Sequence, residues 1–396
     1  MKPETPELPL EAMELQMGPS HPATHGTIKF NLKLEGEKVL DCDVEVGYLH
    51  RGFAKMCEQA TWTQVIPYTD RLNYASPLIN NVGYALSVEK LLGVETPPRC
   101  QFIRVIMCEL SRIYDHLTCC GMAASELGAI TAGFYMIEAR EFLMRIIESV
   151  TGARLTISYT RIGGVKHDLP HDFADQTLDS LNKVRRLLAD CDRLLSRNRI
   201  FIDRISGVGV ISKDTAISYG LTGPILRSTG VSYDVRKAQP YLIYDQLDFS
   251  VPLGSKGDNY DRFVCRIMEI EQSIRIVEQA LKGMPLGPIS LDDPRIVLPG
   301  KEKVYNSIEG LMHQFKLIME GIQVPPGEVY LAVEGGNGEL GFYIVSDGGG
   351  RPYRLRVRPP CFIAMSAFHE MIKNYMLADI IPTFGMVNMI GGECDR

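Results

Sequence analysis

Four stretches of this chain carry apolar residues at intervals of three and four, and each is long enough for a helix of several turns. They cover residues 99–118, 134–150, 175–205 and 258–283. Such spacing puts the apolar side chains on one face of a helix, which must be buried against a neighbour. Helices of this length pack as antiparallel bundles, so we expect a helical bundle at the centre of the fold.

Period-two alternation near both ends of the chain predicts strands beside this bundle. Near the start, TIKFNLKLEG and EKVLDCDVEVGYLH alternate on either side of Glu35-Gly36, which is typical of a hairpin. Near the end, three strands are expected in EVYLAVEG, GELGFYIVSDG and PYRLRVRPP, followed by a helix near 361–378. We therefore predict an α+β fold, with an N-terminal β-hairpin region, a central long-helix bundle and a small C-terminal antiparallel β region.

The same patterns divide the chain into three expected parts. An N-terminal arm and hairpin region covers 1–60, a helical bundle core covers 61–325, and a C-terminal β region, helix and tail cover 326–396. Residues 1–17 contain three prolines among alternating acids, so we expect an extended or poorly ordered arm there.

Charge and cysteine content exclude several classes of protein. The chain has 42 Lys and Arg against 48 Asp and Glu, with no long basic run, so a nucleic-acid partner is not expected. Its ten cysteines form no CxxC pair, and MKPETPELPLEAMELQ lacks the apolar core of a signal peptide. These features predict reduced thiols in a reducing compartment rather than a disulfide framework or a metal site.

One weakly charged stretch resembles a membrane span. Between Leu117 and Ile137 the only formal charge is Glu126, but glycine, serine, threonine and alanine make the stretch weakly apolar. Tightly packed helices are therefore expected there.

The sequence contains no GxxxxGK[ST], HExxH or GxSxG, so ATP and the chemistry of those motifs are not expected.

The densest polar cluster near the start is GPSHPATHG, residues 18–26. Pro22 and the flanking glycines argue against a helix that would set His21 and His25 as metal ligands. A loop that presents His25 beside Gly26 fits better, and histidine can exchange a proton near neutral pH. An isolated histidine, however, is more often a structural hydrogen-bonding residue.

Two further candidates follow along the chain. In YTDRLNYASP, Arg71 and Tyr74 stand three apart and are predicted to share one face at a helix start. Tyrosine can donate to a carbonyl, and arginine supplies a fixed positive charge, although a buried tyrosine with a capping arginine is the plainer alternative. Glu126 needs a partner such as His25 or an arginine if it is buried.

An ordered set of motifs over nearly the whole length then becomes recognisable. It comprises GPSHPATHG, GYLHRGF, YTDRLNY, ALSVEKLLGVETPPR, CELSRIYDHL, ELGAITAGFY, RIGGVKHDLP, YDVRKAQPY, GELGFYIVSDG and GGECDR. The chain resembles the D-type family of bacterial complex I, the proton-pumping NADH:quinone oxidoreductase, and its mitochondrial and chloroplast counterparts. The resemblance implies a fold like that of the large subunit of [NiFe] hydrogenases.

Those hydrogenases are the main competing family, since they share the HRGF, VEKL and PPR stretches. They hold nickel and iron with two CxxC pairs, and the four thiolate positions match Asn73, Ser76, Ile390 and Glu393 here. None of these residues offers a thiolate, and Cys394 alone cannot build such a centre. The resemblance therefore implies that this chain holds no metal and no cluster.

In the complex I family the vacated metal site is a quinone pocket. The resemblance implies that His25 and Tyr74 hydrogen-bond the quinone carbonyls and deliver protons, with an acid at position 126 beside the histidine. It also implies that Arg71 lies near the terminal iron–sulfur cluster of a neighbouring protein of the complex, with Arg51 as a further candidate for that environment. A positive charge there should favour the reduced cluster.

Two residues depart from the family pattern. The acid that partners the pocket histidine is usually aspartate, whereas this chain has Glu126. Thr156 occupies a position where many relatives carry a histidine near the cluster, and threonine cannot titrate in this range. A weaker pH dependence of the cluster potential is therefore expected, and a lower-potential quinone such as menaquinone would be compatible with it.

The resemblance also implies partners and a place in the cell. Subunits of the B, C, I and H types would surround this chain at the cytoplasmic face of the inner membrane, peripheral to the bilayer, and NADH would bind elsewhere in the complex. The chain would be inactive alone. Two alternatives remain open: a related enzyme that uses another electron donor, and a cofactor-free scaffold descended from a hydrogenase.

Overall fold

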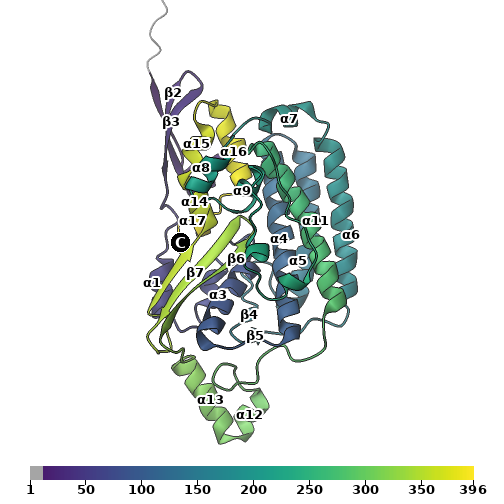
Figure 1. The fold of residues 1–396 in the computed structure, drawn as a ribbon, viewed down its shortest axis with the longest axis vertical. Helices are drawn as coiled ribbons and strands as arrows, with labels where there is room; N and C mark the ends of the chain where they lie inside the picture. Colours follow the sequence, from purple (N-terminus) through teal and green to yellow (C-terminus); the bar gives the residue numbers. More distant parts are fainter. Residues whose placement is uncertain (1–11) are drawn as a thin grey trace, which may run out of the picture.

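The computed structural model describes residues 12–396, and a group of long helices stands side by side along one side of it (Figure 1). These helices are α4 (Pro98–Glu126), α5 (Ile130–Thr151), α6 (Phe173–Leu195) and α11 (Asn259–Gly283). Helix α4 packs against both α5 and α11, and most of its side chains are buried. The predicted helical bundle is confirmed, and α4 packs between α5 and α11 within it.

The weakly charged stretch predicted as packed helices is the corner between α4 and α5. Helix α4 ends at Glu126, and α5 begins at Ile130. A Cβ atom at Gly133 would lie only 2.9 Å from the carbonyl oxygen of Gly121, so the two helices approach closely because these residues are small. Across residues 12–396, none of the helices combines the length and the apolar character needed to cross a bilayer.

The prediction of one helix over 175–205 is wrong, because a cap interrupts it. Helix α6 ends at Leu195, and α7 (Arg199–Ile205) begins after Asn198. The side chain of Asn198 accepts hydrogen bonds from the N–H groups of Ile200 and Phe201, at 3.0 and 3.4 Å, which satisfies the free donors of a new helix start. Apolar spacing continues through the break and does not reveal it.

The helix predicted near 361–378 is also wrong. The chain forms α14 (Pro360–Ser366) and α15 (Phe368–Ile372) and then becomes extended at Lys373. The N–H of Asn374 donates to the Val39 carbonyl, and the Val39 N–H donates to the Tyr375 carbonyl, both at 2.8 Å. Pairing with a strand therefore replaces further helix.

Three small antiparallel sheets complete the fold, and the predicted α+β class is confirmed. The N-terminal sheet has the order β1 (Met13–Met17), β2 (Lys29–Glu35) and β3 (Lys38–Glu45). Part of the predicted arm is thus a strand, and residues 1–11 lie outside the described part of the chain. The C-terminal sheet contains the three predicted strands as β6 (Gly327–Gly335), β7 (Gly338–Ser346) and β8 (Arg354–Arg358). The short pair β4 (Thr160–Arg161) and β5 (Gly164–Val165) forms the third sheet.

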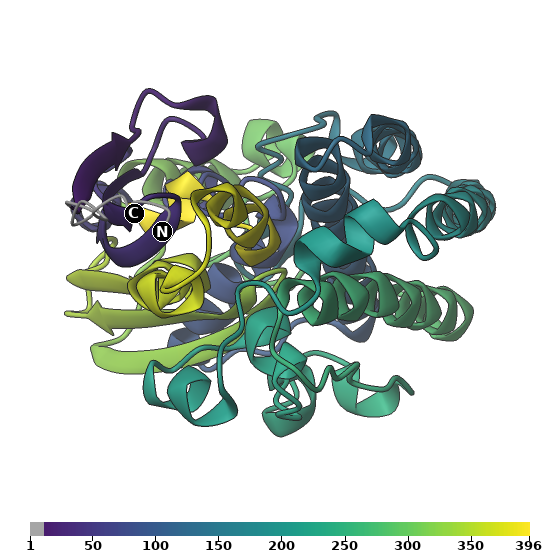
Figure 2. The same cartoon turned by 90° about the horizontal axis from the view of Figure 1, so that it is seen from above.

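The ends of the chain pack together beside the bundle. Figure 2 shows the yellow C-terminal helices, α16 (Ile380–Val387) among them, between the purple N-terminal sheet and the long helices. The Phe30 ring of β2 lies 5.1 Å from the Phe368 ring and 5.6 Å from the Phe384 ring. Aromatic contacts therefore fix the N-terminal sheet against α15 and α16.

A second apolar core lies between α3 (Pro77–Leu92) and the C-terminal sheet. The first core joins the N-terminal strands, the bundle and residues 361–394, so the division at 60 and 325 stays a prediction. The remaining elements are α1 (Phe53–Gln59), α2 (Ile66–Thr69), α8 (Lys213–Ser218), α9 (Gly223–Ser228), α10 (Val235–Ala238), α12 (Lys301–Asn306), α13 (Ile308–Met319), α17 (Gly391–Cys394), and the 3-10 turns η1 (Pro22–Thr24), η2 (Tyr244–Gln246) and η3 (Leu377–Asp379).

Candidate functional site

The connection between β1 and β2 presents His25 in a tight reversal rather than on a helix. A single 3-10 turn, Pro22–Thr24, is capped by the His21 ring, whose Nδ1 accepts from the Ala23 N–H at 3.2 Å. His25 follows in the left-handed region with φ 53°, and Gly26 continues the reversal with φ 71°. The predicted loop is confirmed, and it turns the His25 ring edge-on to Phe384 at 5.2 Å.

Glu126, the last residue of α4, lies beside this histidine. Its Oε1 is 3.7 Å from His25 Nε2, and its side chain is 19% exposed. The expectation that this acid has a partner such as His25 is confirmed. The distance between the two side chains is that of an ion pair and is longer than a hydrogen bond. Its Oε2 is buried without a hydrogen-bond partner among residues 12–396. A Cβ atom at Gly385 would lie 2.7 Å from this oxygen, so α16 can pack close to Glu126 because Gly385 has no side chain.

Arg71 and Tyr74 do not share a helix face, and that prediction is wrong. They lie in the turns between α2 and α3. The side chain of Asn73 accepts from the N–H groups of Ala75 and Ser76, at 3.1 and 3.3 Å, which favours a turn over a helix. Helix α3 begins only at Pro77, which suits a first helical position because it has no N–H.

The segments that carry the candidate residues meet at Gly391 and Gly392 of α17. A Cβ atom at Gly391 would lie 3.0 Å from side-chain atoms of Thr27 and Leu49, two residues from His25 and Arg51 respectively. A Cβ atom at Gly392 would lie 2.4 Å from the Arg71 carbonyl oxygen. This glycine pair therefore lets three distant parts of the sequence converge.

Arg51 and Arg71 are linked directly. Arg51 Nη2 donates to the Arg71 carbonyl at 2.8 Å, and Arg71 Nη1 donates to the Pro67 carbonyl at 2.5 Å. Asp395 accepts from the N–H groups of Gly47 and Leu49, at 3.0 and 2.8 Å, which holds the loop before Arg51. Both Arg51 and Arg71 are exposed.

The segment with Thr156 approaches the same turns. Ser158 donates a hydrogen bond to Asp70, the residue before Arg71. Burial raises the pKa of Asp70, whose carboxyl group lies 3.8 Å from Arg71 Nη1. Thr156 itself is exposed, with φ 50°. The structure thus places the segment that contains Thr156 against the turn that contains Arg71, through the contact between Ser158 and Asp70.

Tyr74 is half-buried, with 42% of its surface exposed. Desolvation raises the pKa of its hydroxyl, and Cys361 adds to the rise, whereas the Gly391 N–H and Arg51 lower it. The pKa shifts therefore favour a protonated hydroxyl that can act as a hydrogen-bond donor.

Beneath Tyr74 lies a buried polar cluster that the sequence did not identify. Asp115 of α4 accepts from the side-chain amides of Asn73 at 3.2 Å and Asn388 at 3.0 Å. Burial raises the pKa of Glu393 to about 7. Cys361 contacts this carboxyl group at 3.4 Å. The polar residues of the motifs CELSRIYDHL and GGECDR are visible in the sequence, but only the packing of the folded chain brings Asp115 and Glu393 into one cluster.

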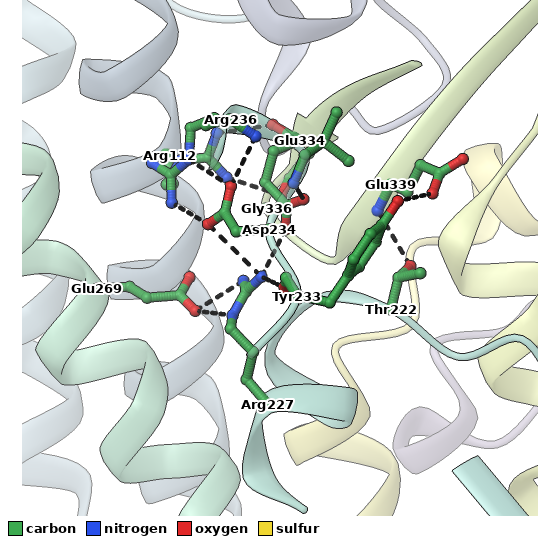
Figure 3. A network of polar contacts seen from close by, with 12 residues as sticks. Arg112, Thr222, Arg227, Tyr233, Asp234, Arg236, Glu269, Glu334, Gly336 and Glu339 are labelled. Atoms are coloured by element: carbon green, nitrogen blue, oxygen red, sulfur yellow. Dashed lines mark hydrogen bonds and ion pairs between the residues drawn. The ribbon is translucent and has the colours of Figure 1, made fainter. Parts of the chain in front are cut away.

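A second buried cluster lies deeper, between the bundle and the C-terminal sheet (Figure 3). Arg227 bridges Glu269 at 2.7 Å and Glu334 at 2.8 Å. Arg236 bridges Asp234 at 2.7 Å and Glu109 at 3.1 Å. The charges come from α4, α9, α10, α11 and β6, so this cluster ties the bundle to the sheet that supports the site.

Comparisons with known proteins identify the family of the chain. The family model described as "Respiratory-chain NADH dehydrogenase, 49 Kd subunit" matches residues 126–396. The chain is 56% identical to a D-type subunit of NADH-quinone oxidoreductase from Sorangium cellulosum, over 98% of this chain and 97% of that one. It is 53% identical to the D-type subunit from Myxococcus xanthus, over 98% and 94%. It is also 50% identical to the C/D-type subunit from Bdellovibrio bacteriovorus, over 97% and 69%.

Proposed function

The chain belongs to the family of the 49 kDa subunit of respiratory-chain NADH dehydrogenase, and on that premise we propose that it forms a quinone-reducing site. It is a subunit of NADH-quinone oxidoreductase, complex I. The observation that carries the proposal is the convergence at Gly391 and Gly392 of the segments bearing His25, Arg51 and Tyr74. Two proton-exchanging groups and a fixed positive charge suit the reduction of a carbonyl-bearing ring.

His25 and Tyr74 hydrogen-bond the two quinone carbonyls in this proposal and supply protons as the ring is reduced. Quinone takes up two electrons and two protons, so two donors are required. The hydroxyl of Tyr74 is kept protonated by its surroundings. Glu126 Oε1 lies 3.7 Å from His25 Nε2, so a carboxyl group stands beside the ring that exchanges protons in this proposal.

Arg51 and Arg71 lie towards the electron donor. An iron–sulfur cluster in an adjacent B-type subunit supplies the electrons, and a positive charge beside it favours its reduced state. Two exposed arginines support this assignment, since the Arg51 guanidinium donates a 2.8 Å hydrogen bond to the backbone carbonyl of Arg71. Within residues 12–396, no group of three or more His, Cys, Asp or Glu side chains is arranged to hold a metal ion.

Subunits of the B, C, I and H types surround the chain in this proposal, at the cytoplasmic face of the inner membrane. NADH binds elsewhere in the complex, and proton translocation takes place in its membrane proteins. The relative that combines the C and D types in its name supports a C-type neighbour, since this chain spans 69% of it. Quinone, either ubiquinone or menaquinone, is the substrate.

Replacing Tyr74 with phenylalanine or His25 with alanine should lower quinone reduction by about 10²-fold or more, the usual contribution of a positioned proton donor. The assay uses membranes that contain the assembled complex. Electron transfer from NADH to an artificial acceptor that bypasses the quinone site is measured in parallel, and it should be unchanged.

Matched controls are Tyr353→Phe and His171→Ala, which alter exposed residues before β8 and before α6. Both should keep wild-type quinone reduction. If Tyr74→Phe and His25→Ala behave like these controls in an intact complex, the site assignment is wrong and a scaffold role is favoured.

A further inference from the structure

Asp70 is a fully buried acid that follows α2 and precedes Arg71 in the chain. Its Oδ2 accepts a hydrogen bond from the Ser158 hydroxyl, and the same oxygen lies 3.8 Å from Arg71 Nη1. Arg71 Nη1 also donates to the Pro67 carbonyl at 2.5 Å. The guanidinium group of Arg71 therefore faces two oxygen atoms, one from the backbone and one from a buried carboxyl group.

Ser158 belongs to a segment whose backbone is strained. Thr156 has φ 50° and Ser158 has φ 48°, which residues other than glycine rarely adopt. Such a conformation persists only where the surrounding structure holds it. Arg161 Nη1 donates to the Ser158 carbonyl at 2.6 Å, while the Ser158 hydroxyl donates to Asp70. Both the backbone and the side chain of Ser158 are therefore fixed.

The hairpin β4–β5, which follows this segment, is anchored by a buried ion pair. Arg104 of α4 lies 2.6 Å from Glu89 of α3, and both are buried. Arg104 Nη2 donates to the carbonyls of Arg161 and Gly164, at 2.9 and 3.0 Å. Glu89 Oε1 accepts from the Gly163 N–H at 2.7 Å. Hydrogen bonds to buried charges are costly to lose, so α3 and α4 hold the hairpin and the segment before it in place.

The neighbours of Asp70 favour its charged form. Burial raises the pKa of this carboxyl group, but Ser158, Asn81 and Arg71 each oppose the rise. Among residues 12–396, no other acid lies within ion-pair distance of the Arg71 side chain. A negative charge this close reduces the positive potential that an arginine presents to a more distant group. Asp70 can thus affect both the orientation and the effective charge of Arg71.

We infer that Asp70 is a positioning residue that fixes the Arg71 guanidinium group and limits the positive charge presented to the electron donor. This inference rests on the quinone-reducing function proposed above, in which Arg71 lies towards the iron–sulfur cluster of the B-type subunit. Ser158 completes the arrangement, because its hydroxyl holds the carboxyl oxygen that faces Arg71. Asp70 and Arg71 therefore act on the cluster potential in opposite directions, since nearby charge is one of its determinants.

The test is a redox titration of that cluster, followed by its electron paramagnetic resonance signal, in membranes with the assembled complex. Arg71→Gln removes a positive charge and should lower the potential. Asp70→Asn keeps the shape of the side chain but removes a negative charge, so it should raise the potential. The matched control is Asp179→Asn, which makes the same change at an exposed residue of α6 beside Lys183 and should leave the potential unchanged.

Shifts of opposite sign separate this role from a structural one, because a loosened turn has no reason to move the two potentials apart. An unchanged or lowered potential in Asp70→Asn would overturn the inference. If Arg71→Gln leaves the potential unchanged, Arg71 does not lie towards the donor and the inference is rejected with that assignment. The quinone-reducing function is tested separately by Tyr74→Phe, which bears on it whatever the cluster potential does.

Substitutions of Ser158 decide the matter if Asp70→Asn fails to assemble. Ser158→Ala removes the hydroxyl that holds Asp70 and should lower quinone reduction about three- to tenfold, less than a full 1 Å displacement costs. Reduction of the artificial acceptor should be unchanged. Ser158→Gly also lacks the hydroxyl but suits φ 48° better, so it should be as slow as Ser158→Ala. A wild-type rate in either variant would overturn the inference, because the hydrogen bond to Asp70 is absent from both.

Discussion

Replacing Glu109 with glutamine should lower the free energy of unfolding of this protein by about 3–5 kcal/mol, the usual cost of breaking a buried ion pair. Both oxygens of Glu109 are occupied by donors. Tyr244 and Ser273 each donate to them at 2.6 Å, and Arg236 Nη1 lies 3.1 Å from Oε2. Arg112 completes the set at 3.2 Å. An amide offers one acceptor oxygen instead of two and no charge, so Arg112 loses its carboxylate partner and Arg236 keeps only Asp234.

The expected result is a several-fold fall in the amount of assembled complex, together with a shorter half-life on heating. The matched control is Glu141→Gln, the same chemical change on α5. Glu141 pairs with Arg145 and Arg154, but its side chain is 36% exposed, so this substitution should cost less than about 1 kcal/mol. Equal accumulation of the two variants would contradict the stabilising role of the cluster.

The same residue predicts a direction for acid unfolding. Burial alone would raise the pKa of Glu109, but Arg112 and Arg236 outweigh it and lower the pKa from 4.5 to about 2. A lowered pKa in the folded state adds stability that is fully present above pH 4.5 and is lost as the pH falls towards 2. In Glu109→Gln this part of the acid dependence should disappear.

The predicted elements are those whose apolar faces run without interruption. The apolar residues of α4, α5 and α11 recur at spacings of three and four, although residues 103–117 of α4 are buried on every side. Strands β6 and β7 alternate between buried and exposed side chains over only part of their length. The breaks escaped prediction for a local reason. The cap at Asn198 and the pairing of residues 374–375 with β3 each depend on two local hydrogen bonds, which leave the apolar pattern unchanged.

The candidate site could be predicted only where one motif carries the chemistry. His25 lies in a cluster whose proline and glycines already specify a loop, and Glu126 is conspicuous as a charge in a weakly charged stretch. Glu393, Cys361 and Asp115 are ordinary single residues in the sequence. Their proximity depends on the packing of α17 against the turns after α2 and on α4 passing beneath them, which no local pattern encodes.

Gly392 fixes where those turns lie, and Gly392→Ala should therefore lower quinone reduction by about 10–100-fold, as a displacement of about 1 Å does. The new Cβ atom would meet the carbonyl oxygens of Arg71 at 2.4 Å and Leu72 at 2.8 Å. Both atoms belong to the backbone, so the clash cannot be relieved by a side-chain rotation. The turn must shift, and Tyr74 shifts with it.

Gly391→Ala and Gly300→Ala give a graded comparison. At Gly391 the added methyl group meets side-chain atoms of Thr27 and Leu49 at 3.0 Å, which can rotate, so a smaller loss is expected. At Gly300, before α12, it meets nothing within 4 Å, and full activity is expected. Quinone reduction and artificial-acceptor reduction are measured together in membranes with each variant. The loss of quinone reduction should increase from Gly300→Ala through Gly391→Ala to Gly392→Ala. Reduction of the artificial acceptor should be the same in all three, because only the position of Tyr74 changes. Identical quinone reduction in all three would show that the distance between α17 and the turn does not control the site.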